Sequence, residues 1–388
     1  MRRGGITAAA LALALLLSAC TSGSSPASTP AGPAERGSRT EVQQSGLTVE
    51  RSLELQYAEQ FSVDYCEGGC ALIRIGDENE YLVVPEGVPV PAGLPETVVV
   101  LQQPLEHIYL VATSAMDLFC ALDGVESIRL SGTDADGWYI DEVKEAMERG
   151  EMLYAGKYSA PDYELIHAEQ CDLAVESTMI YHTPEVKEQL ERLGVPVLVE
   201  RSSYESSPLG RMEWLKLYGV LLGQEEEAAA IYQQELDSLR NVIGQESTGK
   251  TVAFFYITST GAANVRKSGD YVARMIEMAG GQYVFQDLGD DNALSTMNMQ
   301  METFYAEARD ADCLIYNSTI DGELHTIDEL LVKSPLLADF KAVQEGNVWC
   351  TEQNLFQSTM GLGDMILDIH AVLTEEDPED LTYLHRLT

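Results

Sequence analysis

Basic residues are scarce in this chain. The 388 residues include 24 Lys and Arg against 63 Asp and Glu, a formal net charge of −39. Nucleic-acid binding depends on clustered Lys and Arg that neutralise phosphates, so this composition excludes nucleic acid as a partner. The acidic residues are spread along the chain rather than gathered in a tail, which is typical of a soluble, well-hydrated surface.

The motifs of common enzyme classes are also missing. No phosphate-binding G-x-x-x-x-G-K-[ST], dinucleotide-binding G-x-G-x-x-G, nucleophile G-x-S-x-G or zinc-binding H-E-x-x-H occurs. The histidines lack the spacing of metal ligands. They are His107, His167, His182, His325, His370 and His385. We therefore expect no catalytic residue, no bare metal site and no resident cofactor.

The N-terminal apolar run is short. Ile6–Leu17 follows Arg2 and Arg3 and is twelve residues long, too short to span a bilayer comfortably. It ends in Leu17-Ser18-Ala19-Cys20, which resembles the bacterial lipobox; a plain secretory signal is the alternative. We predict a signal peptide over residues 1–19 and lipidation of Cys20, which would tether the protein to the outer face of a membrane.

Beyond Cys20 the composition changes twice. Residues 20–46 are rich in Ser, Thr, Pro, Gly and Ala, which predicts a flexible linker. Residues 47–97 alternate apolar and polar positions around short polar turns, which predicts a small β-meander. Within it lies Cys66-Glu67-Gly68-Gly69-Cys70, where a disulfide and two free thiols are both compatible with the spacing. The other cysteines lie in apolar contexts typical of core residues. They are Cys120, Cys171, Cys313 and Cys350.

Strand and helix patterns then alternate, which predicts α/β architecture with a mostly parallel sheet covered on both faces. In a first lobe, residues 98–223, we expect strands at Val98–Leu101, Ile108–Ala112, Ser127–Leu130, Met152–Tyr154, Leu173–Val175 and Val197–Val199. In a second lobe, residues 245–388, we expect strands at Thr251–Tyr256, Cys313–Tyr316 and Asn347–Trp349 and helices at Tyr271–Met278, Glu302–Arg309, Ile327–Val332 and Met360–Leu373. The fold class is two doubly wound, Rossmann-like lobes.

Residues 224–244 carry the pattern on which this arrangement depends. Ala228, Tyr232, Leu236 and Leu239 recur at three- and four-residue steps, and acidic residues occupy the first turn. The pattern predicts a helix over Glu225–Ile243, about 28 Å long at ~1.5 Å per residue. We interpret it as a rigid strut between the lobes; a surface helix within one larger domain is the alternative.

Ligands of open parallel sheets gather at the carboxyl ends of the strands. The segments that follow the predicted strands combine aromatic rings with arginines, which suits a flat or bulky, partly anionic ligand. The predicted cleft residues are Trp138, Tyr158, Tyr204, Arg211, Tyr256 and Arg266. Each of these residues also has an alternative, purely structural role. For example, Tyr256 would pack in the core, Arg211 would brace a helix, and Arg266 would be a surface charge.

Several stretches in order resemble one family. They are Gly156-Lys157-Tyr158-Ser159-Ala160-Pro161-Asp162-Tyr163-Glu164-Leu165-Ile166 before Cys171–Val175, then Leu193-Gly194-Val195-Pro196-Val197, Ala279-Gly280-Gly281, and Phe340-Lys341-Ala342-Val343-Gln344-Glu345-Gly346-Asn347-Val348. The set resembles substrate-binding lipoproteins of ABC importers for iron–siderophore, haem and cobalamin. In that family one long rigid helix joins two lobes. The resemblance covers residues 105–373 and leaves the role of 47–95 open.

The resemblance implies a receptor that captures an iron- or cobalt-containing chelate and delivers it to an ABC permease and its ATPase. It also implies that Glu164 and Glu302, each in a helix's first turn, dock on basic residues of the permease; stabilising the helix dipole is the alternative role. A surface chelatase and a ligand sensor are the alternative functions. Tyr158, Met179 and His182 are all available as haem ligands, so the chelate stays open.

Overall fold

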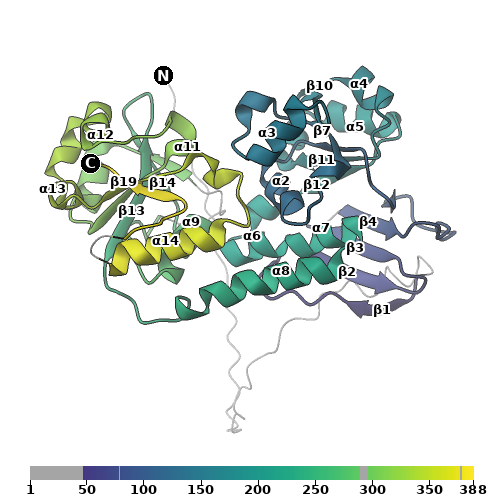
Figure 1. Ribbon diagram of the computed structural model, residues 1–388, viewed down its shortest axis with the longest axis horizontal. Coiled ribbons are helices and arrows are strands. Elements are labelled where there is room, and N and C mark those ends of the chain that lie inside the picture. Colours follow the sequence, from purple (N-terminus) through teal and green to yellow (C-terminus); the bar gives the residue numbers. More distant parts are fainter. Residues whose placement is uncertain (1–46, 78, 289–295, 376–377) are drawn as a thin grey trace, which may run out of the picture.

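The computed structural model describes residues 47–77, 79–288, 296–375 and 378–388. The predicted signal peptide, the lipidated Cys20 and the linker lie outside these residues. No helix in the described segments is long and apolar enough to cross a membrane. Figure 1 shows two lobes side by side, with a smaller sheet below the first lobe and helices along the lower edge.

The smaller sheet comes first in the chain. Its strands run in the order β1-β2-β3-β4-β5. They are β1 Val49–Ser52, β2 Phe61–Cys66, β3 Ala71–Ile75, β4 Asn79–Val84 and β5 Val98–Gln102. The first four form an antiparallel meander, as expected, whereas β5 pairs parallel to β4. We expected this last strand to open the sheet of the first lobe, and that prediction is wrong: its pairing partner is the meander.

Both faces of this small sheet are covered. Alternating side chains such as Val63 and Ile73 join the main core, while Leu72, Leu82 and Val84 pack under the loop that carries Val88 and Leu94. The period of two along each strand separates the two sets. Cys66 and Cys70 are buried free thiols within the second set. The sheet is therefore an integral layer of the fold.

The first lobe contains a five-stranded, all-parallel sheet in the order β12-β11-β6-β7-β8. Its strands are β6 Ile108–Leu110, β7 Ile128–Ser131, β8 Leu153–Tyr154, β11 Leu173–Ser177 and β12 Val197–Glu200, and its helices are α2 Thr113–Cys120, α3 Asp141–Glu148, α4 Tyr163–Ala168 and α5 Pro184–Arg192. All five strands lie where the apolar runs predicted them, and a short hairpin of β9 Gly156–Lys157 and β10 Ala160–Pro161 precedes α4.

Three helices connect the lobes in sequence: α6 Pro208–Glu213, α7 Leu215–Leu222 and α8 Glu225–Ser238. Gly223 ends α7 in the left-handed conformation (φ +72°) that favours glycine. The α-helix α8 is 14 residues long and buries only Ala228 and Tyr232. It stops at Ser238, where a 3-10 turn begins, five residues short of the predicted end. In Figure 1 it runs along the lower edge from the small sheet toward α14. Its role as a rigid strut stays a prediction, as do the domain limits.

The second lobe contains a mixed seven-stranded sheet. Its strands are β13 Thr251–Ile257, β14 Ala263–Arg266, β15 Gln282–Tyr283, β16 Thr296–Met299, β17 Cys313–Tyr316, β18 Val348–Thr351 and β19 Leu384–Arg386, and its helices are α9 Tyr271–Met278, α10 Met301–Ala308, α11 Ser318–Asp321, α12 Ile327–Lys333, α13 Lys341–Glu345 and α14 Leu362–Thr374. The parallel centre β13-β17-β18 was predicted. The antiparallel β14, β16 and β19 were not, because each is only three or four residues long, too short for its alternation to stand out from a loop.

Candidate functional site

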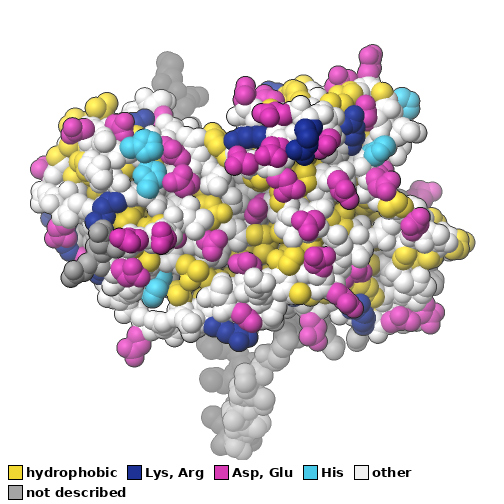
Figure 2. Space-filling view, viewed as in Figure 1, with side chains coloured by type: hydrophobic (Ala, Val, Ile, Leu, Met, Phe, Trp, Pro, Cys, Tyr) yellow, Lys and Arg dark blue, Asp and Glu magenta, His cyan; other side chains and the backbone are white. Residues whose placement is uncertain are grey.

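The segment that precedes α14 joins the two lobes. The side chain of Gln357 donates from Nε2 to the Gly137 carbonyl and accepts at Oε1 from the Tyr139 N–H, each at 2.8 Å. Farther along, Met360 N–H donates to the Asp117 carboxylate at 2.7 Å. Figure 2 shows the surface notched between the lobes at the upper edge of the view, and acidic side chains outnumbering basic ones on the visible face. The lobes therefore meet at the ends of their sheets that were expected to bind ligand.

Two predicted arginines converge at this junction. Arg211, from α6, places its guanidinium carbon 3.6 Å from the centre of the Tyr271 ring, and Arg266, at the end of β14, lies 5.9 Å from the same ring. Arg266 also faces the Phe356 ring at 5.0 Å and pairs with Asp270 at 3.6 Å. Two cations and two aromatic faces thus share one partly desolvated site, the combination that binds an anionic aromatic or conjugated ligand.

Burial dominates the electrostatics of this cluster. It lowers the pKa of Arg211, although the guanidinium stays charged because its ordinary pKa is so high. Burial also raises the pKa of Tyr271 and of Asp270, and the nearby arginines only partly oppose it. Arg211 is braced by the Ser203 carbonyl at 2.6 Å, so the alternative structural role is also fulfilled. The arginines are held in place before any ligand arrives.

Trp138 is not a cleft residue, and that prediction is wrong. Its side chain is 1% exposed, and Nε1 donates to Ser131 Oγ at 3.1 Å. The next residue, Tyr139, is 43% exposed instead. Trp138 has extended backbone (φ −94°, ψ 140°), and successive side chains of extended backbone point to opposite sides. The exposed aromatic side chain of this loop is therefore Tyr139, and the loop's place in the cleft stays a prediction.

The three predicted tyrosines are half-buried and separate from the arginine pair. Tyr204 donates to Thr178 Oγ1 at 3.2 Å and stacks under the Arg201 guanidinium at 4.6 Å. Tyr158 lies in the turn between β9 and β10, and Tyr256 packs partly against the core from β13. Across the described segments, none of them hydrogen-bonds to or stacks on either arginine of the pair. Their roles in the cleft stay predictions.

Exposed apolar side chains at the strand ends were overlooked as a group. Tyr139 follows β7, Met179 follows β11, and Ile320 follows β17; Met179 is 44% exposed and Ile320 is 62% exposed. For Met179 and Ile320 the available signal was a large apolar residue four positions after the predicted strand ends Val175 and Tyr316. Together they add apolar area to the same ends of the sheets.

Glu176 is a second overlooked residue. It lies near the carboxyl end of β11, an interior strand of the first lobe's sheet, and is fully buried. Both carboxylate oxygens lack a hydrogen-bond partner among the described residues. Burial raises its pKa to about 8, so the group is mostly protonated at neutral pH. Nothing in its sequence context separates it from the other 62 acidic residues.

The two predicted docking residues are available at the surface. Glu164 is exposed in the first turn of α4, which Asp162 caps by accepting from Leu165 N–H at 3.0 Å, and Glu302 is exposed in the first turn of α10. Both glutamates lie in the first turn of a helix, as predicted. Whether these carboxylates dock on a partner stays a prediction.

No three His, Cys, Asp or Glu side chains in the described segments are grouped so that they could hold a metal ion.

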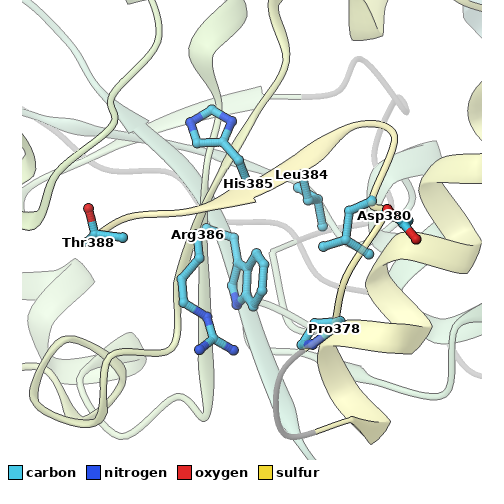
Figure 3. A pocket seen from close by; sticks show the side chains of 8 residues that line it. Pro378, Asp380, Leu384, His385, Arg386 and Thr388 are labelled. Carbon is cyan, nitrogen blue, oxygen red and sulfur yellow. The ribbon is translucent and has the colours of Figure 1, made fainter.

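A separate cavity of about 450 Å³ lies at the β18–β19 edge of the second lobe. None of the predicted site residues lines it; its lining residues are Trp349, Pro378, Asp380, Leu381, Leu384, His385, Arg386 and Thr388. In Figure 3, His385 and Arg386 project to opposite sides of β19.

Sequence comparison identifies relatives of part of the chain. Residues 128–355 match the family described as periplasmic binding protein. Two uncharacterized lipoproteins of Methanocaldococcus jannaschii are 26% identical over 248 residues and 25% identical over 261 residues, which cover 62% and 63% of this chain. These matches span 56% and 64% of the relatives' own length.

Solved structures share the fold at low identity. A periplasmic heme binding protein from Pseudomonas aeruginosa superposes with a TM-score of 0.55 at 17% identity, covering 73% of this chain and 98% of that one. An ABC-type Fe3+-hydroxamate transport system protein from Saccharomonospora viridis gives 0.54 at 19%, covering 70% and 94%. A catecholate-siderophore binding protein from Vibrio cholerae gives 0.54 at 13%, covering 70% and 95%. These likenesses establish the two-lobed α/β architecture.

Proposed function

Because the chain belongs to the periplasmic binding protein family, we propose that it is the substrate-binding lipoprotein of an ABC importer and captures a metal chelate between its lobes. The observation that carries this proposal is the convergence of Arg211 and Arg266 on the Tyr271 ring. Guanidinium groups pair with the carboxylates, catecholates or phosphates of a chelate, while the Tyr271 ring, 4% exposed and covered by Arg211, holds the cations in position. The chelate is an iron–siderophore, haem or cobalamin.

Two further observations support the chemical class of the ligand. Structures that share this fold include proteins described as binding heme, a ferric hydroxamate and a catecholate siderophore. The described residues offer no cluster of metal-ligating side chains, so the iron or cobalt would arrive already held by its organic ligand. The protein's task is recognition, and the site residues need only bind and orient the cargo.

The membrane anchor and the permease complete the proposal. Leu17-Ser18-Ala19-Cys20 is the sequence that supports lipidation, and two relatives bear the name lipoprotein. An anchored receptor with a flexible linker would remain within reach of its permease. Glu164 and Glu302 would then contact basic loops of the permease through exposed first-turn carboxylates.

The ligand test uses protein purified from its native host. Native mass spectrometry and absorbance spectroscopy identify any retained chelate, and the stripped protein is then titrated with haemin, a ferric trihydroxamate, a ferric catecholate and cobalamin. We expect one class to bind, and to be recovered unchanged. Failure of all four classes to bind would contradict the proposal, and chemical turnover of the bound chelate would favour the chelatase instead.

The docking prediction separates delivery from capture. The variant carrying Glu164→Ala and Glu302→Ala removes two rim charges, which should slow association with the permease while leaving chelate affinity unchanged. We expect loss of uptake and of transporter ATPase stimulation in reconstituted vesicles. A matched control replaces Glu188 and Glu307, which are also exposed helical carboxylates. Unimpaired uptake would remove the pair from the docking surface.

A further inference from the structure

One side chain makes both hydrogen bonds that connect the second lobe to the loop after β7. Gln357 follows the 3-10 turn Gln353–Phe356, and its amide bonds the backbone of Gly137 and Tyr139, more than 200 residues away in sequence. The carbonyl oxygen and the NH2 group are used at once, and both distances are 2.8 Å. An amide is the side chain that offers a donor and an acceptor at this separation.

The same segment holds the first lobe at a second place. Thr359 Oγ1 donates to the Ser114 carbonyl at 2.6 Å, and Met360 N–H donates to Asp117 at 2.7 Å, and both acceptors lie in α2. The neighbouring residue Phe356 faces the Arg266 guanidinium at 5.0 Å. The short stretch 356–360 therefore touches one of the two site arginines and both contact points on the opposite lobe.

We propose that Gln357 is an interlobe clasp: its amide holds the loop at Gly137–Tyr139 against the second lobe and sets how far the lobes open. When the lobes separate, these two bonds have to break along with the α2 contacts, because all of them join the stretch 357–360 to the first lobe. The proposal rests on the proposed function only in treating the space between the lobes as the ligand site.

Hydrogen exchange tests the clasp without any ligand. The Tyr139 amide donates to Gln357 itself, and the Met360 amide donates to Asp117 at the other contact, so the two amides report on the clasp and on the lobe interface separately. The ligand-free protein, labelled with 15N-tyrosine and 15N-methionine, is compared with Gln357→Ala. The control is Gln353→Ala, which truncates another glutamine of the same segment, four residues earlier.

We expect Gln357→Ala to exchange the Tyr139 amide about tenfold faster, which corresponds to about 1.4 kcal/mol, and the Met360 amide at least about threefold faster. The control should match the wild type at both positions. Faster exchange at Tyr139 alone would show local fraying and overturn the clasp, and unchanged exchange at both amides would overturn it as well. Neither result depends on which chelate the protein binds, so a failed ligand assay and a failed clasp are distinguishable.

Discussion

A buried carboxylate of α6 holds the segment between β1 and β2 of the small N-terminal sheet, next to Glu205, which accepts from the N–H groups of Glu59 and Gln60. Glu213 is fully buried in α6 and accepts hydrogen bonds from the N–H groups of Gln56, Tyr57 and Ala58 at 2.8–3.0 Å. Lys216 donates to the same carboxylate at 2.7 Å. Replacing Glu213 by alanine would leave three backbone donors and a largely buried ammonium without their shared acceptor.

The expected cost of Glu213→Ala is about 3–5 kcal/mol in the free energy of unfolding, the range found when one partner of a buried ion pair is removed. Guanidinium denaturation followed by circular dichroism measures it, and hydrogen exchange of the 56–58 amides shows whether the sheet detaches. Glu226→Ala, an exposed carboxylate in α8, is the matched control and should change stability by less than about 0.5 kcal/mol. The reasoning would be refuted if the free energy of unfolding of Glu213→Ala lay within about 1 kcal/mol of the wild-type value and hydrogen exchange of the 56–58 amides were unchanged.

Two further predictions concern the lobe junction. Arg266→Ala and Arg211→Ala should each weaken binding of the native chelate about tenfold or more, because a hydrogen bond to a charged group contributes about 1.5–3 kcal/mol. Calorimetric titration measures the affinity, and Arg274→Ala, which truncates an exposed arginine, is the control. Equal affinities for the wild type and both variants would exclude the two arginines from the site. Burial raises the pKa of Asp117 to about 6 from 3.8, so the folded protein binds this proton more tightly than the unfolded chain does. Lowering the pH from 7 to 4.5 should therefore stabilise the wild type by about 2 kcal/mol relative to Asp117→Asn, and parallel pH profiles of denaturation for the two proteins would contradict it.

The secondary structure was largely predictable where local signals agree. The limits of α9 and β17 match the prediction, since Asp270 caps α9 by accepting from Val272 N–H and the four apolar residues of β17 are all buried. The antiparallel strands of the second lobe were missed because each is only three or four residues long, so that even the alternation in Ala263–Arg266 and Thr296–Met299 is too brief to be told from a loop. The assignment of Val98 to the first lobe failed for another reason: a strand's composition does not specify its pairing partner.

For the candidate site, the sequence indicates which loops lie at the carboxyl ends of the strands, but it does not indicate which side chain of each loop is exposed. Strand ends identify the loops, because parallel strands align their carboxyl ends at one edge. Which residue of a loop faces the cleft depends on backbone torsion angles, and that is how Tyr139 rather than Trp138 became exposed. Glu176 could not be singled out, since its burial depends on the helices that cover β11.

The sequence by itself determined the α/β class, the alternation of strands and helices, and the places of Glu164 and Glu302 in the first turn of a helix, because these follow from periodicity and residue type within short windows. Only the tertiary structure decided the pairing of β5 with the meander, the burial of Trp138, the meeting of Arg211 and Arg266 at Tyr271, and the bridge from Gln357 to Gly137. These contacts join positions up to 220 residues apart. They form because sheets and helices pack as whole units, and a local sequence pattern carries no information about which distant surface a unit will meet.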